Sequence, residues 1–565
     1  MDRKIARRRE RRNQDRKFVL MIGMIALALI AICILLNVLS ALPRAEIARA
    51  PEPSAIATLA LPTRAPTPVI AKRIAIGDEI TGTLRISITQ SARDLGLTLI
   101  NPDASADARI SALETAGAQV ISERVYVVAD WFASARANIA SNDLRALWQG
   151  KAMSDGVNAL IVSDAAYADL VAMLGAPGSN VKRVAPNELS AQLWANHNAL
   201  AVLPFDALTP KLRLLALDNI NLLQRDAALG AYPLVRHIYA SGDPALIATL
   251  RKQLPAPTRD VSRLTTVIMT GSSSIARTSA QKTDERGDPT FAARQVAEIL
   301  ASADLTHVSN EVAFTADCKP VLRVVTLCSK PEYLAAFQLA GVDIIGLTGN
   351  HLLDYGQPAF LKTLDLYDAN KLRYYGGGRN EIEARKILYV EHNGNRLAFL
   401  GANSFGPASV WATATKPGAR KYVADEIKRD LAEARARADV VFIEFQAEET
   451  YEYVPYLGNR ALFRAALDAG ADVITGAQAH QPQALEFSAD GSKIILYGLG
   501  NLFFDQMFGD NVRQGLVARH TLHRGKLIQT ELLTTMLEDY VQPRWAMPAE
   551  RAEIFRLVFG ASGFK

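Results

Sequence analysis

Outside its first 17 residues, the 565-residue sequence has almost no net charge. The whole chain has a formal charge of +5, but residues 1–17 hold nine basic and three acidic side chains, so residues 18–565 sum to about −1. A nucleic-acid-binding body would need basic clusters on a folded face, and the sequence therefore predicts no nucleic-acid partner. Disorder of the whole chain is also excluded, because 49% of the residues are hydrophobic and can fill sizeable cores. At about 150 residues per domain, we expect two or three domains.

Cysteine is scarce, with three residues in the whole chain. Cys33 lies in a long apolar run, whereas Cys318 and Cys328 lie ten residues apart with Pro320 between them. No CxxC pair or nearby histidine pair accompanies them, which argues against a structural zinc site. A disulfide is permissible outside the cytoplasm. We therefore expect Cys318 and Cys328 to form one.

The apolar run covers residues 18–42 and contains no charged side chain. At about 1.5 Å per residue it would span roughly 37 Å as a helix, enough to cross a hydrocarbon core of about 30 Å with some tilt. The alternative is a cleavable signal peptide, because residues 48–50 have the small-x-small form. The apolar region of such a peptide usually runs for only about 7–15 residues. We therefore predict an uncleaved transmembrane helix.

The basic arm 1–17 sets the predicted orientation of this helix. Basic residues stay on the cytoplasmic side of a membrane, so the arm is expected inside and the bulk of the chain outside the cytoplasm. The protein would be a single-pass membrane protein with a cytoplasmic N-terminus. Six prolines among residues 43–68 predict an extended linker, which we place at residues 43–75.

Residues 76–255 alternate between short apolar runs and helical patterns, which predicts an α/β domain with parallel strand pairing. Strand-like runs cover 159–163 and 199–205, and a helical pattern covers 165–174. The segments 142–150, 201–206, 214–218 and 232–234 resemble a periplasmic substrate-binding protein of the phosphate-binding type. That resemblance implies a small-molecule ligand between two lobes, with no contact residue that can be named. The alternative is a divergent α/β domain that binds nothing small.

Residues 262–545 contain six strand-like runs that each end in Gly, Asn, Glu, His or Ser. The runs are 267–270, 306–309, 343–348, 439–443, 472–475 and 494–499. Ligands of open α/β sheets bind beyond the carboxyl ends of the strands, so the six endings predict a single cleft. A helical pattern at 424–436 and hairpin signals at 393–394, 490–491 and 524–525 predict a layered α/β/β/α sandwich. Residues 546–565 are taken as a C-terminal tail.

Three motifs in this second domain carry a family resemblance. GNHLLDYG at 349–356, GAQAHQPQALE at 476–486 and ILYGLGNLFFDQ at 495–506 together resemble the bacterial capsule-synthesis CapA family, which is associated with poly-γ-glutamate synthesis. The domain of that family is similar to the calcineurin-like metallophosphatases. The resemblance implies a metallophosphatase-like sandwich on the outside of a bacterial cell membrane. Its partners would be an extracellular anionic polymer or the machinery that makes the polymer.

Several positions of the family's motifs are kept, and others are not. The kept residues are Arg277, Glu311, Asn350, His351, Asp354, Glu448, His480, Glu486, Asn501 and Asp505. Ser272 stands where the opening motif has an aspartate, Glu444 where a later motif has a histidine, and Gln478 where the last motif has its first histidine. Ser272 is a poor replacement for a carboxylate that would bridge two metal ions.

The remaining residues leave two kinds of chemistry open. Histidine and carboxylate ligands suit one Mn, Fe or Zn ion, and the candidate ligands are Glu311, Asn350, His351, Asp354, Glu444 and His480. A metal-free acid–base pair could instead use His351 or His480 as proton carrier. In either case the resemblance implies His351, His480 and Glu448 as catalytic residues, and Ser272, Arg277, Gln478 and Asn501 as binding residues.

Each of these residues also has a purely structural interpretation. Asn350 and Asn501 could cap turns, His351 could be a hydrogen-bonded core histidine, and Asp354 could be the N-cap of a helix near 357–370. Two functional hypotheses follow for the whole protein. The first is a metal-assisted hydrolase or transferase acting in the synthesis, export or anchoring of a capsule polymer. The second is a non-catalytic scaffold that binds the polymer, either poly-γ-glutamate or a polysaccharide, through a degenerate site.

Overall fold

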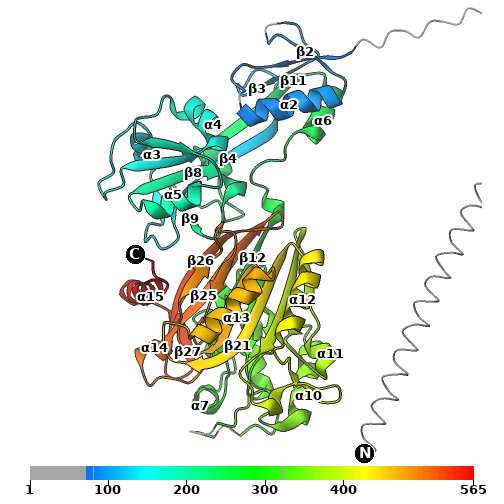
Figure 1. Cartoon of the computed structure of the whole chain (residues 1–565), viewed down its shortest axis with the longest axis vertical. Helices are drawn as coiled ribbons and strands as arrows, with labels where there is room; N and C mark the ends of the chain where they lie inside the picture. Colours follow the sequence, from blue (N-terminus) through cyan, green and yellow to red (C-terminus); the bar gives the residue numbers. More distant parts are fainter. Residues whose placement is uncertain (1–70, 81, 103, 320, 323–324, 565) are drawn as a thin grey trace, which may run out of the picture. The chain divides into compact units, whose positions relative to one another are not determined.

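The computed structural model describes residues 71–80, 82–102, 104–319, 321–322 and 325–564 (Figure 1). The predicted cytoplasmic arm 1–17, the predicted transmembrane helix 18–42 and linker residues 43–70 lie outside these ranges and stay predictions. Among the described residues, no helix has both the length and the apolar character needed to cross a membrane. The predicted linker is too long at its C-terminal end, because the first strand already begins at Arg73.

The first folded region is a mixed α/β structure built on one nine-stranded sheet. The order of its hydrogen-bonded strands is β2-β1-β3-β11-β4-β8-β6-β7, and β9 pairs with β4. Its elements are β1 (Arg73–Ile76), α2 (Gly82–Asp94), β2 (Thr98–Ile100), β3 (Ala108–Ser111), β4 (Gln119–Trp131), β5 (Asn138–Ile139), α3 (Ser141–Trp148), β6 (Ala159–Ser163), α4 (Asp164–Leu174), β7 (Val181–Val184), α5 (Leu189–Ala195), β8 (Ala199–Pro204), β9 (Leu212–Leu214), β10 (Ala216–Leu217), β11 (Val235–Gly242) and α6 (Pro244–Gln253).

Two separate cores divide this region into lobes. One core contains Ile74, Ile88 and Ile238, and the other contains Trp148, Leu160 and Phe205. Strand β4 is 13 residues long and contributes to both cores, and it pairs antiparallel with β11 and β8. The prediction of parallel pairing is therefore right at the two outer parts of the sheet and wrong at its centre. The reason is that β4 and β11 cross between the lobes, which a run of short strand–helix repeats does not reveal (Figure 1).

The second folded region contains two facing sheets. Their orders are β16-β15-β14-β12-β25-β26-β27, with β13 beside β14, and β18-β19-β21-β22-β24-β23. The elements are β12 (Leu264–Thr270), β13 (Ser272–Ser273), α7 (Arg277–Arg286), α8 (Ala297–Ala301), β14 (Leu305–Asn310), α9 (Leu334–Leu339), β15 (Val342–Gly346), α10 (Gly356–Ala369), β16 (Arg373–Tyr375), β17 (Gly377–Gly378), α11 (Glu381–Ala384), β18 (Leu388–His392), β19 (Asn395–Asn403), β20 (Gly418–Ala419), α12 (Ala424–Arg437), β21 (Val440–Thr450), α13 (Leu457–Asp468), β22 (Val473–Ala479), β23 (Leu485–Phe487), β24 (Ile494–Leu496), α14 (Asp510–Arg513), β25 (Gln514–His523), β26 (Lys526–Glu538), β27 (Gln542–Trp545) and α15 (Pro548–Ala561).

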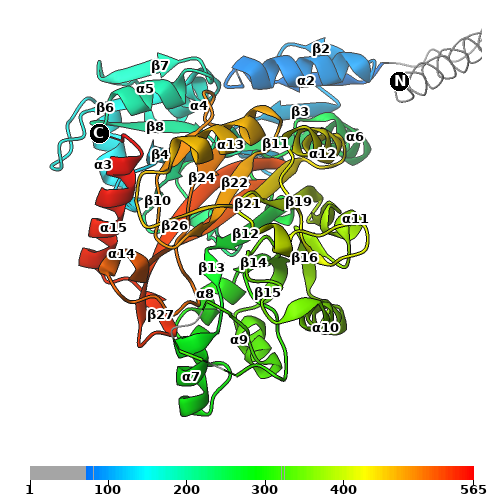
Figure 2. The ribbon, with the colours of Figure 1, turned by 60° about the horizontal axis from the view of Figure 1, so that its bottom comes forward.

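Three apolar layers show that this region has the predicted α/β/β/α order. The inner layer joins the two sheets through residues such as Val267 and Phe442. One outer layer packs helices α8, α9 and α10 on the first sheet, with Phe360 at its centre. The other packs α12 and α13 on the second sheet through Leu431 and Phe463 (Figure 2). Successive side chains of β21 belong to different layers because they alternate between the two faces of the strand. Val441 and Ile443 face the helices, whereas Val440 and Phe442 face the other sheet.

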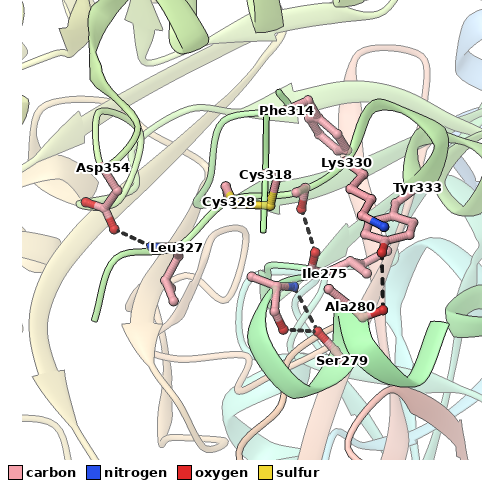
Figure 3. Close-up of a disulfide and its surroundings, with 12 residues drawn as sticks. Ile275, Ser279, Ala280, Phe314, Cys318, Leu327, Cys328, Lys330, Tyr333 and Asp354 are labelled. Atoms are coloured by element: carbon pink, nitrogen blue, oxygen red, sulfur yellow. Dashed lines mark hydrogen bonds between the residues drawn. A yellow bond between two sulfur atoms is a disulfide. The ribbon is translucent and has the colours of Figure 1, made fainter. Parts of the chain in front are cut away.

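All three hairpin signals of the second region join antiparallel strands. The pairs are β18 with β19, β23 with β24 and β25 with β26. At the first, Asn393 and Gly394 both have positive φ angles, 49° and 67°, which Asn-Gly adopts readily in a two-residue turn. The C-terminal tail contains helix α15, whose Ile554 and Val558 are buried. Cys318 and Cys328 form a disulfide with their Cα atoms 5.7 Å apart (Figure 3).

Candidate functional site

Polar side chains from both sheets of the second region meet where the strands end. Gln446 in the second half of β21 donates from Nε2 to Asn350 Oδ1 at 3.0 Å, and to Gln478 Oε1 on β22. Asn350 follows β15. The backbone N–H of Gln478 donates to Ser272 Oγ on β13 at 3.4 Å. The predicted convergence of the strand endings is therefore present. We call the group Ser272, Glu311, Asn350, His351, Gln446, Gln478, His480 and Asn501 the strand-end cluster.

His480 forms a second branch of the cluster. Its Nδ1 lies 2.8 Å from Asn501 Oδ1, and the backbone of Asn501 bridges to Ser272. The imidazole is 4% exposed and lies between two aromatic rings, with centroids 5.9 Å from Tyr451 and 4.7 Å from Phe504. Asn501 is therefore a partner of His480 rather than a turn cap alone. The motifs gave no reason to single out Tyr451.

His351 is paired with Asp354, and the pair lies beside Glu311. His351 Nδ1 and Asp354 Oδ2 are 2.7 Å apart. Burial alone would lower the pKa of His351, but the hydrogen bond to Asp354 and the negative charges of Glu311 and Asp354 together raise it above its usual value. Asp354 is not a helix N-cap, because α10 has Tyr355 at that position. Its carboxylate instead accepts the backbone N–H of Leu327 from the disulfide loop at 2.8 Å (Figure 3).

Glu311 has a buried carboxylate without a hydrogen-bond partner. The residue is 1% exposed, and within the described parts of the chain neither carboxylate oxygen finds a donor. Three further polar groups of these strand endings are also buried without a hydrogen-bond partner among the described residues. They are Gln446 Oε1 and the hydroxyls of Ser273 and Ser274. Buried polar groups are normally hydrogen-bonded, and an unpaired one is costly. A donor-rich group or a cation would satisfy these acceptors.

Glu444 lies deeper than the cluster, between the two sheets. It is 2% exposed, and its Oε1 accepts hydrogen bonds from Thr348 at 2.7 Å and Ser309 at 3.1 Å. Burial raises the pKa of Glu444 to about 7, although the two hydroxyls oppose the shift. Its Oε2 is 3.6 Å from Nε2 of His307, whose pKa burial lowers to about 3. We call Glu444, Ser309, Thr348 and His307 the interior group; His307 was missed because its strand-like segment carries no motif signal.

Two residues of the site have backbone conformations that side chains rarely adopt. Gln478 has a φ of 75° and Arg277 a φ of 48°. Arg277 makes an ion pair with Asp505, 2.5 Å from Nη2 to Oδ1, which fixes the start of α7 against the segment after β24. Strain of this kind costs about 1–3 kcal/mol per residue and concentrates at functional sites.

Glu448 and Glu486, also named by the motifs, lie outside the hydrogen-bond network. Glu448 is exposed near the end of β21, and among the described residues it has no hydrogen bond or ion pair with the cluster. Glu486 pairs with Arg464 at 2.8 Å. The structure therefore does not join the predicted catalytic acid to His351 or His480.

The donor set does not fit a two-ion centre. Ser272 and Gln478 occupy two of the ligand positions, and Glu444 is already hydrogen-bonded in the interior group. Among the described residues, no three His, Cys, Asp or Glu side chains are grouped closely enough to hold a metal ion. Glu311 is the one predicted ligand whose buried carboxylate lacks other partners. The predicted single ion stays a prediction that would depend on this residue.

The two-lobed region has its own pocket where a ligand was expected. A cavity of about 360 Å³ lies between the beginnings of α2 and α4 and is lined by Gly82, Leu84, Arg124, Asp164, Asp169 and Arg183. Arg124 comes from β4, which joins the lobes, and its Nε is buried without a partner in the described residues. Arg183 and Asp164 form an ion pair. The pocket thus has charged groups of both signs.

Comparison with known proteins finds relatives of a stretch that includes most of the second region. Residues 240–506 match the family described as bacterial capsule synthesis protein PGA_cap. The expected resemblance to CapA is confirmed for this stretch. The chain is 32% identical to the capsule biosynthesis protein CapA of Bacillus anthracis over 206 residues, which is 36% of this chain and 50% of that protein. It is 28% identical to the PGA biosynthesis protein CapA of Bacillus subtilis over 221 residues, 39% of this chain and 57% of that one.

The chain thus spans about half the length of these curated relatives. Among solved structures, an ABC-type phosphate transport receptor from Vibrio cholerae is 11% identical, with a TM-score of 0.26, and the match covers 32% of this chain and 93% of that one. The mixed α/β fold expected for both regions is present. The ligand of the two-lobed region remains a proposal.

Proposed function

We propose that this protein is an accessory factor for an extracellular capsule polymer, of the poly-γ-glutamate type or a polysaccharide, acting in its synthesis, export or anchoring. The match of residues 240–506 to the PGA_cap family supports a role in the production of a capsule polymer. The charge-free run 18–42 behind a basic arm supports a single-pass anchor with the folded regions outside the cytoplasm. The Cys318–Cys328 disulfide fits that compartment.

The strand-end cluster binds the polymer without cleaving it. The observation that carries this proposal is the replacement of metal ligands by hydrogen-bonding side chains, which link Ser272, Gln478, Gln446 and Asn350 into one network. The unpartnered acceptors are Glu311 and Gln446 Oε1. Amide N–H and hydroxyl groups of a polymer would satisfy them. Since residues 18–565 are near neutral, recognition depends on such local contacts rather than on overall charge.

A metal-assisted hydrolase is the second candidate, and Glu311 favours it. One divalent ion held by Glu311 would also satisfy the buried carboxylate, and the His351–Asp354 pair beside it could carry a proton. The two candidates differ in what must be bound. The first candidate requires that the protein binds polymer. The second requires that it binds a metal ion and hydrolyses a substrate.

One set of measurements on the full-length chain in lipid nanodiscs separates the candidates. Bound metal is measured by mass spectrometry, polymer binding by sedimentation, and hydrolysis with a phosphodiester and a γ-glutamyl anilide. The variants are His351→Ala and His480→Ala, with His197→Ala in the two-lobed region as matched control. We expect polymer binding that both cluster variants weaken and the control does not. About one bound metal ion per chain, together with hydrolysis that the cluster variants reduce, would establish the hydrolase instead. If the wild-type protein neither binds polymer nor hydrolyses a substrate, both candidates are contradicted.

The proposed orientation has a separate test. Protease treatment of intact cells should digest the folded regions and leave only a fragment of the N-terminal residues protected. A protected full-length chain would show that the folded regions lie inside the cell.

A further inference from the structure

A second cavity lies far from the strand-end cluster in sequence and has no place in the proposed function. Its volume is about 300 Å³, and we call it the junction pocket. Its walls come from the two-lobed region, from β26 and β27, from helix α15 and, through Ile299, from helix α8. The lining residues used below are Phe132, Arg213, Glu531, Trp545, Arg551, Phe555 and Phe559. These seven lie outside residues 240–506, which match the capsule-synthesis family, whereas Ile299, which also lines the pocket, lies inside that stretch.

The two folded regions are in direct contact at this pocket. The backbone N–H of Leu214 on β9 donates to Gln529 Oε1 on β26 at 3.1 Å, and both residues line the cavity. Ile528 of the same strand belongs to the core of the second lobe. The pocket therefore has a fixed floor, as small-molecule sites that are largely formed before binding require.

One side of the pocket is aromatic. The ring centroids of Phe132 and Phe559 are 6.0 Å apart, and those of Phe555 and Phe559 are 5.0 Å apart and stacked. Trp545 lines the same cavity. Aromatic walls of this kind contribute most of the binding free energy for a flat apolar body.

The pocket also carries two guanidinium groups, of Arg213 and Arg551, that no carboxylate neutralises at short range; that of Arg551 lies 5.6 Å from the ring centroid of Phe555. Arg213 Nη1 donates to the backbone oxygen of Ser134 at 2.6 Å. Among the described residues, neither Arg213 nor Arg551 has a carboxylate within ion-pair distance. Burial, followed by the positive charge of Arg551, lowers the pKa of Arg213, although the negative charges of Glu531 and Asp130 oppose the shift. Two like charges facing one cavity are unfavourable unless an anion lies between them.

The neighbouring acids are already engaged. Glu531 pairs with Arg519 at 3.3 Å. Asp130 pairs with Arg136 at 2.7 Å and also accepts the hydroxyl of Ser134. Arg213 and Arg551 against Glu531 leave the lining residues with one excess positive charge for an anionic ligand.

We propose that the junction pocket binds a small organic carboxylate with a flat or branched apolar body. The carboxylate lies between Arg213 and Arg551, and the apolar body lies against Phe132, Phe555 and Phe559. Guanidinium groups bind carboxylates through paired hydrogen bonds, which a neutral alcohol of the same shape cannot replace. At about 300 Å³ the cavity has the size of the smallest ligand sites.

The test measures binding of three carboxylates to the full-length chain in lipid nanodiscs by calorimetry, with empty nanodiscs as background. The probes are indole-3-propionate, 4-phenylbutyrate and octanoate, each beside its alcohol. At least one carboxylate should bind with a Kd below about 1 mM and about tenfold or more tightly than its alcohol. Equal binding of acid and alcohol, or no binding by any probe, would overturn the proposal.

Variants locate the site. Arg551→Gln on α15 should remove the preference for the acid, and Arg213→Gln should do the same if the variant folds. Arg551 is exposed, so its replacement tests the proposal even if Arg213→Gln unfolds the chain. The matched control is Arg556→Gln on the same helix, where Arg556 pairs only with Glu553 in the described residues. An equal loss with Arg556→Gln would also contradict the proposal, because it would indicate a general charge effect.

Discussion

The strand-end cluster and the interior group are both polar and both buried in the same sandwich, yet they are built in opposite ways. In the interior group, Glu444 accepts two hydroxyl hydrogen bonds from the facing sheet. In the cluster, the carboxylate of Glu311 accepts none among the described residues. The difference teaches that burial alone does not mark a functional acid. A buried acid that accepts hydrogen bonds from the facing sheet links the two sheets, whereas one without a hydrogen-bond partner is a candidate for ligand binding.

The largest effect should come from removing the donors of the interior group. The double variant Ser309→Ala, Thr348→Val leaves the Glu444 carboxylate buried without hydrogen bonds. At pH 8, where Glu444 is ionised, we expect the free energy of unfolding to fall by about 3–4 kcal/mol. Urea unfolding followed by circular dichroism measures it.

Thr475→Val is the matched control for this prediction. Thr475 is also a buried threonine, 2% exposed, but its hydroxyl has no partner in the part of the chain that the structure describes. Its replacement should change the stability by less than about 0.5 kcal/mol or increase it. Equal losses in the double variant and the control would remove the distinction between satisfied and unsatisfied groups.

The pH dependence of stability gives the next largest effect. The pKa of Glu444 is about 7 in the folded protein, against 4.5 for an ordinary glutamate. Between these values the folded chain keeps a proton that the unfolded chain has released, so stability falls as the pH rises from 4.5 to 7. The whole shift corresponds to about 3 kcal/mol. Glu444→Gln should flatten this part of the curve and be more stable than the wild type at pH 8.

Replacing the cluster acid should have a smaller effect of opposite sign. Glu311→Gln removes a buried charge that has no hydrogen bond, so we expect the free energy of unfolding to rise by about 1–2 kcal/mol while polymer binding is lost. Stability is measured by urea unfolding and binding by sedimentation. Glu391→Gln, at an exposed position on β18, is the control and should change neither. A destabilised Glu311→Gln would show that the carboxylate has a structural partner.

The sequence predicts which strands carry the cluster but not how deep each side chain lies. Phe442, Glu444 and Gln446 alternate along β21, so these three point to one face, as period-2 spacing requires. The pairing of β21 with β22 is irregular between Gln446 and Thr450, and Glu448 lies in that stretch. Phe442 is in the inner core, Glu444 in the interior group, Gln446 in the cluster, and Glu448 is exposed. Residue type and spacing do not encode where the facing sheet ends.

Long-range pairing limits sequence prediction in the first region for a similar reason. The hairpin at Asn393 and Gly394 is local, so two adjacent residues suffice to predict it. The crossing of β4 and β11 joins residues 119–131 to residues 235–242. No short motif marks a pairing over that distance, and the alternation of strands and helices between them favours parallel order. The same applies to the junction pocket, whose arginines come from β9 and α15.

The smallest effect concerns His351, which links the cluster to the disulfide loop. Its pKa is raised in the folded protein, so its pairing contributes stability that is fully present below pH 6.5 and is lost as the pH rises through the folded pKa. Asp354→Asn keeps an acceptor for the N–H of Leu327 but removes the charge. We expect a lower pKa of His351 in an NMR titration. We also expect the free energy of unfolding to fall by about 0.5 kcal/mol at pH 5.5 and to be unchanged at pH 9. Asp365→Asn, at an exposed position on α10, should leave the titration unchanged. An unchanged pKa in Asp354→Asn would mean that Glu311 alone holds the proton on His351, and the cluster would then depend on a single acid.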